Sequence, residues 1–162
     1  MEAIRAQTKI EMLLTLRRGE GVLITLIVPV VLLDFFSLIG FKPDGYERSI
    51  DFLLPGMLAL AVMSSALVSL SIRTAYERSY GVLKRLGSTP LSRPQLLIAK
   101  IISVVIVELV EIVLLVLIAA FAYDWRPTGA FPLAILALIL GTAVFSGIGL
   151  LMAGALRAET TL

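Results

Sequence analysis

The chain has 162 residues, of which 59% are hydrophobic, and its mean hydropathy is +1.00. A soluble domain of this size needs more polar surface, so the composition excludes an ordinary soluble protein and indicates one all-α membrane domain. The sequence contains neither Cys nor His, which excludes disulfide bonds, a thiolate nucleophile and a Cys/His metal site. The net charge of +2 matters less than the places where the charges lie.

Residues 1–20 combine basic and acidic side chains with aliphatic ones. No small-residue cleavage site follows the first apolar run, so the segment does not have the pattern of a cleaved signal peptide. Helix-forming residues dominate, although the apolar stripe is blurred, and we expect a helix that lies at the membrane interface before the first span. The alternative is a frayed polar extension.

Four apolar runs each approach or exceed the roughly 20 residues that cross a bilayer. They predict membrane spans at 21–40, 52–72, 95–123 and 131–156. Residues 41–51 and 124–128 are short polar loops, and the former contains the turn sequence Pro-Asp-Gly. Ser92 and Gln95 have the spacing of a capping box, with Pro94 in the first turn of the third span.

Small residues recur along two of the predicted spans. Ala61, Ser65 and Ser69 follow one another every four residues in the second span. The fourth span contains Ala143-x-x-x-Gly147 and Gly149-x-x-x-Ala153. Such patterns favour close contact between helices in a membrane, so we interpret both as packing surfaces.

The basic residues predict the orientation in the membrane. Four Lys or Arg precede the first span, six lie between Arg73 and Lys100, and Arg157 follows the fourth span. The two other loops contain only three, namely Lys42, Arg48 and Arg126. Because short cytoplasmic loops carry the excess of basic residues, we expect both the N-terminus and residue 162 to face the cytoplasm.

Residues 73–94 form the longest polar segment of the chain. Val82, Leu83 and Leu86 have near-helical spacing among basic residues, and Gly87 follows them as a helix-ending residue. Such a short amphipathic helix could insert into a groove of a partner protein. It could equally rest on anionic lipid headgroups, and the spacing alone does not choose between the two.

The chain resembles the permeases of type-2 ATP-binding-cassette (ABC) transporters, and the drug-resistance permeases of actinobacteria and similar bacterial exporters are close in pattern. The similarity covers essentially the whole chain. The matching motifs are Leu54-Pro55-Gly56, Tyr76-Glu77-Arg78, Gly81-Val82-Leu83-Lys84-Arg85-Leu86, Ser88-Thr89-Pro90-Leu91-Ser92-Arg93 and Lys100.

The resemblance implies that a separate cytoplasmic ATPase subunit binds ATP and Mg²⁺ and that this chain binds no cofactor. The sequence contains no G-x-x-x-x-G-K-[ST] phosphate loop, in agreement with that division. By match, residues 81–87 are the coupling helix that contacts the ATPase. The residues expected to couple are Glu77, Gly81, Leu83, Leu86, Thr89, Pro90, Leu91, Ser92 and Arg93. The other expected partners are a second permease copy, identical or not, and the plasma (inner) membrane. No nucleic acid is expected to bind.

The sequence departs from the family pattern in two respects. Tyr80 stands where the similar permeases often carry a charged residue, which puts the polar contacts at that end of the coupling helix in doubt. Family members usually have six spans, whereas four are predicted here. We therefore expect the chain to represent the first part of a six-helix permease, truncated after the fourth span.

Three acidic residues fall inside the predicted spans. Asp34 lies in the first, and Glu108 and Glu111 lie three residues apart, on one face of the third. Carboxylates in a membrane usually face the protein interior or a wet cavity, and two this close do not both ionise. One interpretation is a polar lining of the transport path that attracts cations, and the other is a hydrogen-bonded pair that fixes helix packing.

No catalytic group is evident, because Ser64 and Ser65 have no base partner in the pattern. The function that we predict is an exporter permease that forms the substrate path and is not itself an enzyme. One alternative is a membrane scaffold or assembly factor that docks through 73–93. Another is half of an ion-coupled carrier with Glu108 and Glu111 as proton sites.

Overall fold

The computed structural model describes residues 2–17, 19–81, 92–127, 129 and 131–155, which form helices joined by short loops. In chain order these are α1 (Glu2–Arg17), α2 (Gly19–Leu38), α3 (Ser49–Val62), the π-helix η1 (Met63–Ser69), α4 (Leu70–Ser79), α6 (Arg93–Tyr123) and α7 (Phe131–Ala155). No strand occurs among these residues, so the predicted all-helical class is confirmed.

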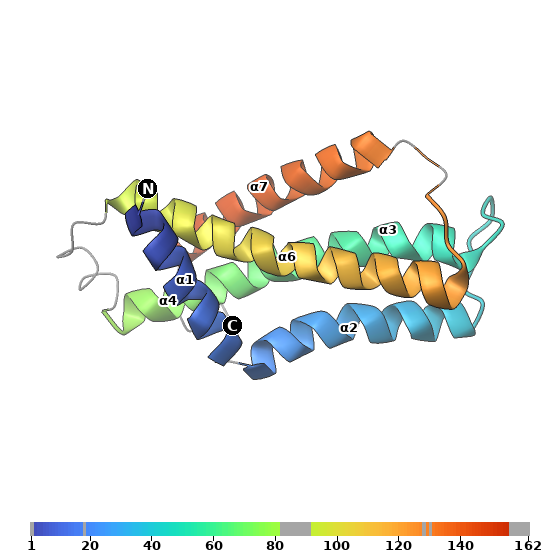
Figure 1. Cartoon of the computed structure of the whole chain (residues 1–162), viewed down its shortest axis with the longest axis horizontal. Coiled ribbons are helices and arrows are strands. Elements are labelled where there is room, and N and C mark those ends of the chain that lie inside the picture. The colour runs from blue at the N-terminus through green and yellow to red at the C-terminus, as the bar shows by residue number, and fades with distance from the viewer. Residues whose placement is uncertain (1, 18, 82–91, 128, 130, 156–162) are drawn as a thin grey trace.

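The long helices form an elongated bundle (Figure 1). α2 and α6 both pack against α3, and α7 packs against η1 and α4. α1 is shorter than α2 and α6 and lies across the end of the bundle where α4 ends and α6 begins, in contact with α6 (Figure 1). The fold therefore gathers the N-terminal helix and both flanks of the predicted coupling segment at one end.

Three helices of the described part are long and apolar enough to cross a membrane. They are Ser49–Ser79, which comprises α3, η1 and α4 without a break, Pro94–Tyr123 and Pro132–Ala155. They overlap the predicted second, third and fourth spans. The apolar stretch of α2, Leu23–Leu38, is shorter.

The helix that holds the second span is longer at both ends than the sequence suggested. It begins at Ser49, inside the predicted loop 41–51, and it continues to Ser79, past the expected boundary at Ile72. The extension is possible because Arg73 and Glu77 pair with charged side chains of neighbouring helices, so their charges do not require a water-exposed loop.

Both ends of α6 are fixed by polar contacts. At its start, the backbone N–H of Ser92 donates to Oε1 of Gln95 at 3.0 Å, which confirms this arm of the predicted capping box. At its other end, the guanidinium of Arg48 donates to the carbonyl oxygens of Tyr123 and of Asp124, the latter at 3.1 Å. These last two contacts satisfy carbonyls that a helix end leaves free.

α7 approaches η1 closely at one of the two predicted small-residue motifs. A Cβ atom built on Gly149 would lie 3.0 Å from the carbonyl oxygen of Ala66, and Ala153 is completely buried. By contrast, Ala143 is exposed and a Cβ on Gly147 would meet nothing within 4 Å among the described atoms. Close packing is therefore confirmed for Gly149-x-x-x-Ala153 but not for the preceding motif.

Candidate functional site

α1 has the opposite polarity to a helix of a soluble protein. Gln7 and Glu11 are buried, with Glu11 only 1% exposed, whereas Ile10, Leu13 and Leu14 are each about half exposed. Glu11 also accepts a hydrogen bond from Nε2 of Gln7 at 3.2 Å. The polar face of α1 therefore packs against the protein, and its apolar face points away from the bundle.

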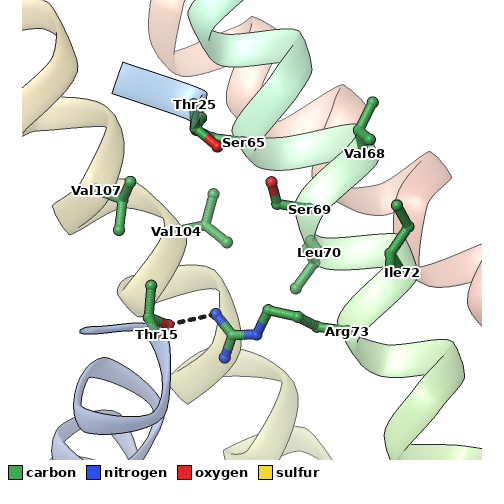
Figure 2. A pocket seen from close by; sticks show the side chains of 10 residues that line it. All are labelled: Thr15, Thr25, Ser65, Val68, Ser69, Leu70, Ile72, Arg73, Val104 and Val107. Atoms are coloured by element: carbon green, nitrogen blue, oxygen red, sulfur yellow. Dashed lines mark hydrogen bonds between the residues drawn. The ribbon is translucent and has the colours of Figure 1, made fainter. Parts of the chain in front are cut away.

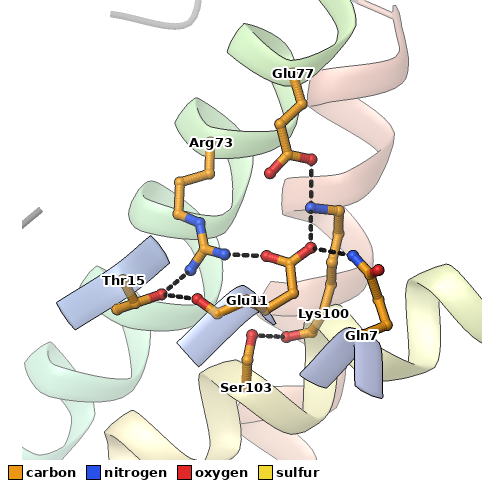
Figure 3. Close-up of polar contacts among 7 residues, drawn as sticks. All are labelled: Gln7, Glu11, Thr15, Arg73, Glu77, Lys100 and Ser103. Carbon is orange, nitrogen blue, oxygen red and sulfur yellow. Dashed lines mark hydrogen bonds and ion pairs between the residues drawn. The ribbon is translucent and has the colours of Figure 1, made fainter. Parts of the chain in front are cut away.

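Glu11 is the centre of a buried ion cluster that joins α1, α4 and α6 (Figure 3). Its Oε1 lies 3.0 Å from Nζ of Lys100, and its Oε2 pairs with the guanidinium of Arg73. Lys100, itself only 1% exposed, also pairs with Glu77. We call these four residues, Glu11, Arg73, Glu77 and Lys100, the ion cluster.

Hydroxyl groups complete the hydrogen bonding around the ion cluster. Nη1 of Arg73 donates to Oγ1 of Thr15 at 2.6 Å, and this hydroxyl donates to the carbonyl of Glu11 at 2.7 Å. Ser103 donates to the carbonyl of Lys100 at 2.7 Å. With two cations and two anions the cluster is balanced, so removal of any one member leaves a buried charge uncompensated, which typically costs about 3–5 kcal/mol.

The predicted coupling residues flank or enter a stretch outside the described residues. Glu77 lies on α4 within the ion cluster, and Gly81 has a positive φ of 71°, which glycine adopts readily. Ser92 precedes α6 and Arg93 is its first residue. The other predicted coupling residues, Leu83, Leu86, Thr89, Pro90 and Leu91, lie outside the described residues.

The three intramembrane carboxyl groups do not gather in one place; each accepts a hydrogen bond from a hydroxyl of another helix. Oδ1 of Asp34 accepts from Tyr123 at 2.9 Å. Oε2 of Glu108 accepts from Thr142 of α7 at 2.7 Å.

Glu108 and Glu111 share one face of α6 but accept hydrogen bonds from two different helices, α7 and η1. Oε2 of Glu111 accepts from Ser65 of η1 at 2.9 Å. Both glutamates are buried, and the Oε1 atom of each has no hydrogen-bond partner among the described residues. This arrangement fixes α6 against η1 and α7 and leaves one buried oxygen of each carboxyl group without a partner among the described residues.

A pocket of about 250 Å³ lies beside the ion cluster, where α1, α2, η1, α4 and α6 meet (Figure 2). Arg73 and Thr15 form one end of it, and Ser65 and Thr25 lie at the other. Aliphatic side chains cover the space between. The pocket thus touches the ion cluster through Arg73 and the Glu111 hydrogen bond through Ser65.

Sequence reasoning missed the ion cluster, the π-helix and the pocket. The signal for the cluster was present in α1, because Gln7, Glu11 and Thr15 are four residues apart and so lie on one helix face. Its partner Lys100 was counted among the cytoplasmic basic residues and among the residues that carry the family resemblance, but it was not predicted to pair with Glu11. No comparable signal marked Met63–Ser69 as a π-helix.

The described residues contain no group of three or more Asp or Glu side chains placed to hold a metal ion. Their buried acidic groups instead contact cations or hydroxyls of other helices. These contacts join helices, and three of the residues that take part, Thr15, Ser65 and Arg73, also line the small pocket.

A family model described as "ABC-2 type transporter" matches residues 2–161. The chain belongs to this family. Neither the curated proteins nor the solved structures yield a match. The predicted resemblance to type-2 ABC permeases is therefore confirmed.

The ABC-2 membrane domain is the transport component of an ABC transporter and is not catalytic itself. Its family membership and its three long apolar helices make this ABC-2 permease a multi-pass membrane protein. Membership also implies an ABC ATPase as its partner.

Proposed function

We propose that this chain is the permease subunit of an ATP-driven exporter, which forms part of the substrate path and receives motion from a separate ATPase through residues 77–93. One observation carries the proposal: ion pairs and hydrogen bonds join α4 to α1, α6 and α7 just before the chain enters this segment. Arg73 pairs with Glu11 of α1 and Glu77 pairs with Lys100 of α6. Arg78 donates to the carbonyls of Ala153, at 3.2 Å, and of Gly154 on α7.

The ion cluster supports a specific route for coupling. α4 ends at Ser79 and α6 begins at Arg93, so the segment between them is held by one helix on each side. The pair between Glu77 and Lys100 joins those two helices near the segment, and Glu11 adds α1. A displacement of the segment by the ATPase would therefore move α1, α4 and α6 together, which is the type of rigid-body shift that alternating access requires.

In the proposed arrangement the chain crosses the plasma membrane four times, with α2 as the first span and α1 at the cytoplasmic interface. The count of eleven basic residues against three supports this orientation. The exposed apolar face of α1 supports the interfacial location. A second permease copy, identical or not, would complete the transport path, and ATP and Mg²⁺ would bind only to the ATPase.

Co-purification from the native host tests the coupling role. We expect the tagged chain to retain an ATPase with a phosphate loop, identified by mass spectrometry, and Leu83→Asp to abolish its retention. Leu38→Asp is the matched control, because Leu38 is 82% exposed at the end of α2 remote from α4's C-terminus. Equal retention by both variants, or the absence of any such ATPase, would contradict the proposal.

A pathway role for Glu108 and Glu111 is a separate part of the proposal. The buried Oε1 atoms of both residues support it, since neither has a hydrogen-bond partner among the described residues and carboxyl groups inside a membrane commonly mark a polar pathway. Glu108→Gln combined with Glu111→Gln should then alter export of cationic substrates by the intact transporter. Unchanged transport at unchanged expression would leave the two glutamates with a packing role only.

A further inference from the structure

The pocket beside the ion cluster combines apolar walls with hydrogen-bonding groups (Figure 2). Val104 and Val107 of α6 form one wall, and Leu70 of α4 contributes on the opposite side. Between these walls, the hydroxyl of Ser69 points into the pocket and makes no hydrogen bond to any described residue. The Ser69 hydroxyl is therefore available to a ligand as both a hydrogen-bond donor and an acceptor.

The remaining polar atoms of the pocket are already engaged. Ser65 donates a hydrogen bond to Glu111, and Thr15 donates one to the carbonyl of Glu11. Arg73, which lines one end, is neutralised by Glu11. A charged ligand would therefore lose its hydration without meeting an unpaired opposite charge, whereas a neutral molecule would not incur this cost.

The volume restricts the size of the ligand. An engineered apolar cavity of roughly 150 Å³ accommodates benzene. The present pocket of about 250 Å³ is therefore large enough for two fused rings or a body of similar size. It is too small for most of a phospholipid.

We propose that this pocket binds a small neutral amphiphile, with an apolar body the size of two fused rings and one hydroxyl that bonds to Ser69. Thr15 and Arg73 line the pocket and also take part in the contacts that hold α1. The bound molecule would therefore contact the residues that hold the N-terminal helix in place. The site lies within one chain and goes beyond the proposed coupling function, since its ligand need not be the transported substrate.

Binding of 2-naphthol to the full chain in lipid nanodiscs tests this site, with empty nanodiscs as the background. We expect saturable binding of one molecule per chain. Val107→Trp should fill the pocket and weaken binding at least tenfold. Val110→Trp, on the same helix but exposed and outside the pocket lining, should bind as the unmodified chain does.

Two further measurements keep the test decisive if the larger side chain disturbs folding. Ser69→Ala should weaken binding about fivefold, as expected for the loss of one hydrogen bond. 2-Naphthoate, which has the same rings and a negative charge, should bind at least tenfold more weakly than 2-naphthol. Four results would each overturn the proposal. They are uptake that does not saturate, equal binding by the Val107 and Val110 variants, no effect of Ser69→Ala, and equal affinity for 2-naphthoate and 2-naphthol.

Discussion

Lys100→Met should release α1 from the bundle. Lys100 is 1% exposed and pairs with both Glu11 and Glu77, and it is the only cation that the described residues bring to Glu77. Loss of one partner of a buried ion pair costs about 3–5 kcal/mol. Glu11 keeps Arg73 and Glu77 is partly exposed, so we take the lower value, about 3 kcal/mol, which corresponds to a roughly hundredfold easier opening of the α1 contact.

Cysteine labelling can measure this opening directly, because the chain contains no native Cys. Thr8 of α1 is suitable, since its Oγ1 is buried without a partner among the described residues, and Thr8→Cys should therefore disturb little. A water-soluble maleimide should label Thr8→Cys slowly in the otherwise unmodified chain and about a hundredfold faster with Lys100→Met. Lys9→Cys, at an exposed neighbouring position, should label rapidly in both backgrounds.

A charge-balanced variant separates the ion cluster from simple packing. Lys100→Met combined with Glu77→Gln leaves the pair between Glu11 and Arg73 intact and removes the unpaired carboxylate. We expect this double variant to recover most of the slow labelling at Thr8→Cys. Equal labelling rates in the Lys100→Met and unmodified chains would refute the reasoning, because α1 would then not depend on the ion cluster.

Two further predictions concern the packing of the spans and can be measured by thermal unfolding in detergent. Gly149→Val should destabilise the protein by about 1–3 kcal/mol, because its Cβ would lie 3.0 Å from the carbonyl of Ala66. Gly147→Val, in open space, should have little effect. Similar losses of stability for both variants would contradict the close contact at Gly149. Glu111→Gln should keep the acceptor for Ser65 and change stability by less than about 0.5 kcal/mol. Glu111→Leu removes the acceptor and should cost about 0.6–1.7 kcal/mol. Equal stability of the two variants would exclude a contribution from this hydrogen bond.

Much of the helical architecture could be predicted from the sequence, because long apolar runs report directly on bilayer-spanning helices. The start of α6 at Arg93 follows from Ser92, Pro94 and Gln95, since capping preferences act locally. The end of α4 could not be placed in this way. Local composition assigned Arg73 and Glu77 to a polar segment, whereas their partners on α1 and α6 are remote in sequence.

The candidate site was less predictable for the same reason. Glu108 and Glu111 were recognised because charge in an apolar run is conspicuous, yet their partners Thr142 and Ser65 became evident only once the helices were placed together. Glu11 was overlooked because an acidic residue in a mixed polar helix carries no such contrast. The pocket depends on side chains from five helical elements, an arrangement that no local pattern encodes.

The inverted polarity of α1 has a consequence for how the protein is made. α1 is synthesised before α4 and α6, but Glu11 meets Arg73 and Lys100 only after both have left the ribosome. Until then its carboxylate must stay in water while Ile10, Leu13 and Leu14 favour the bilayer surface. Docking of α1 is therefore a late step of assembly, and it succeeds only when the helices that carry Arg73 and Lys100 have been inserted with these residues on the same side as the N-terminus.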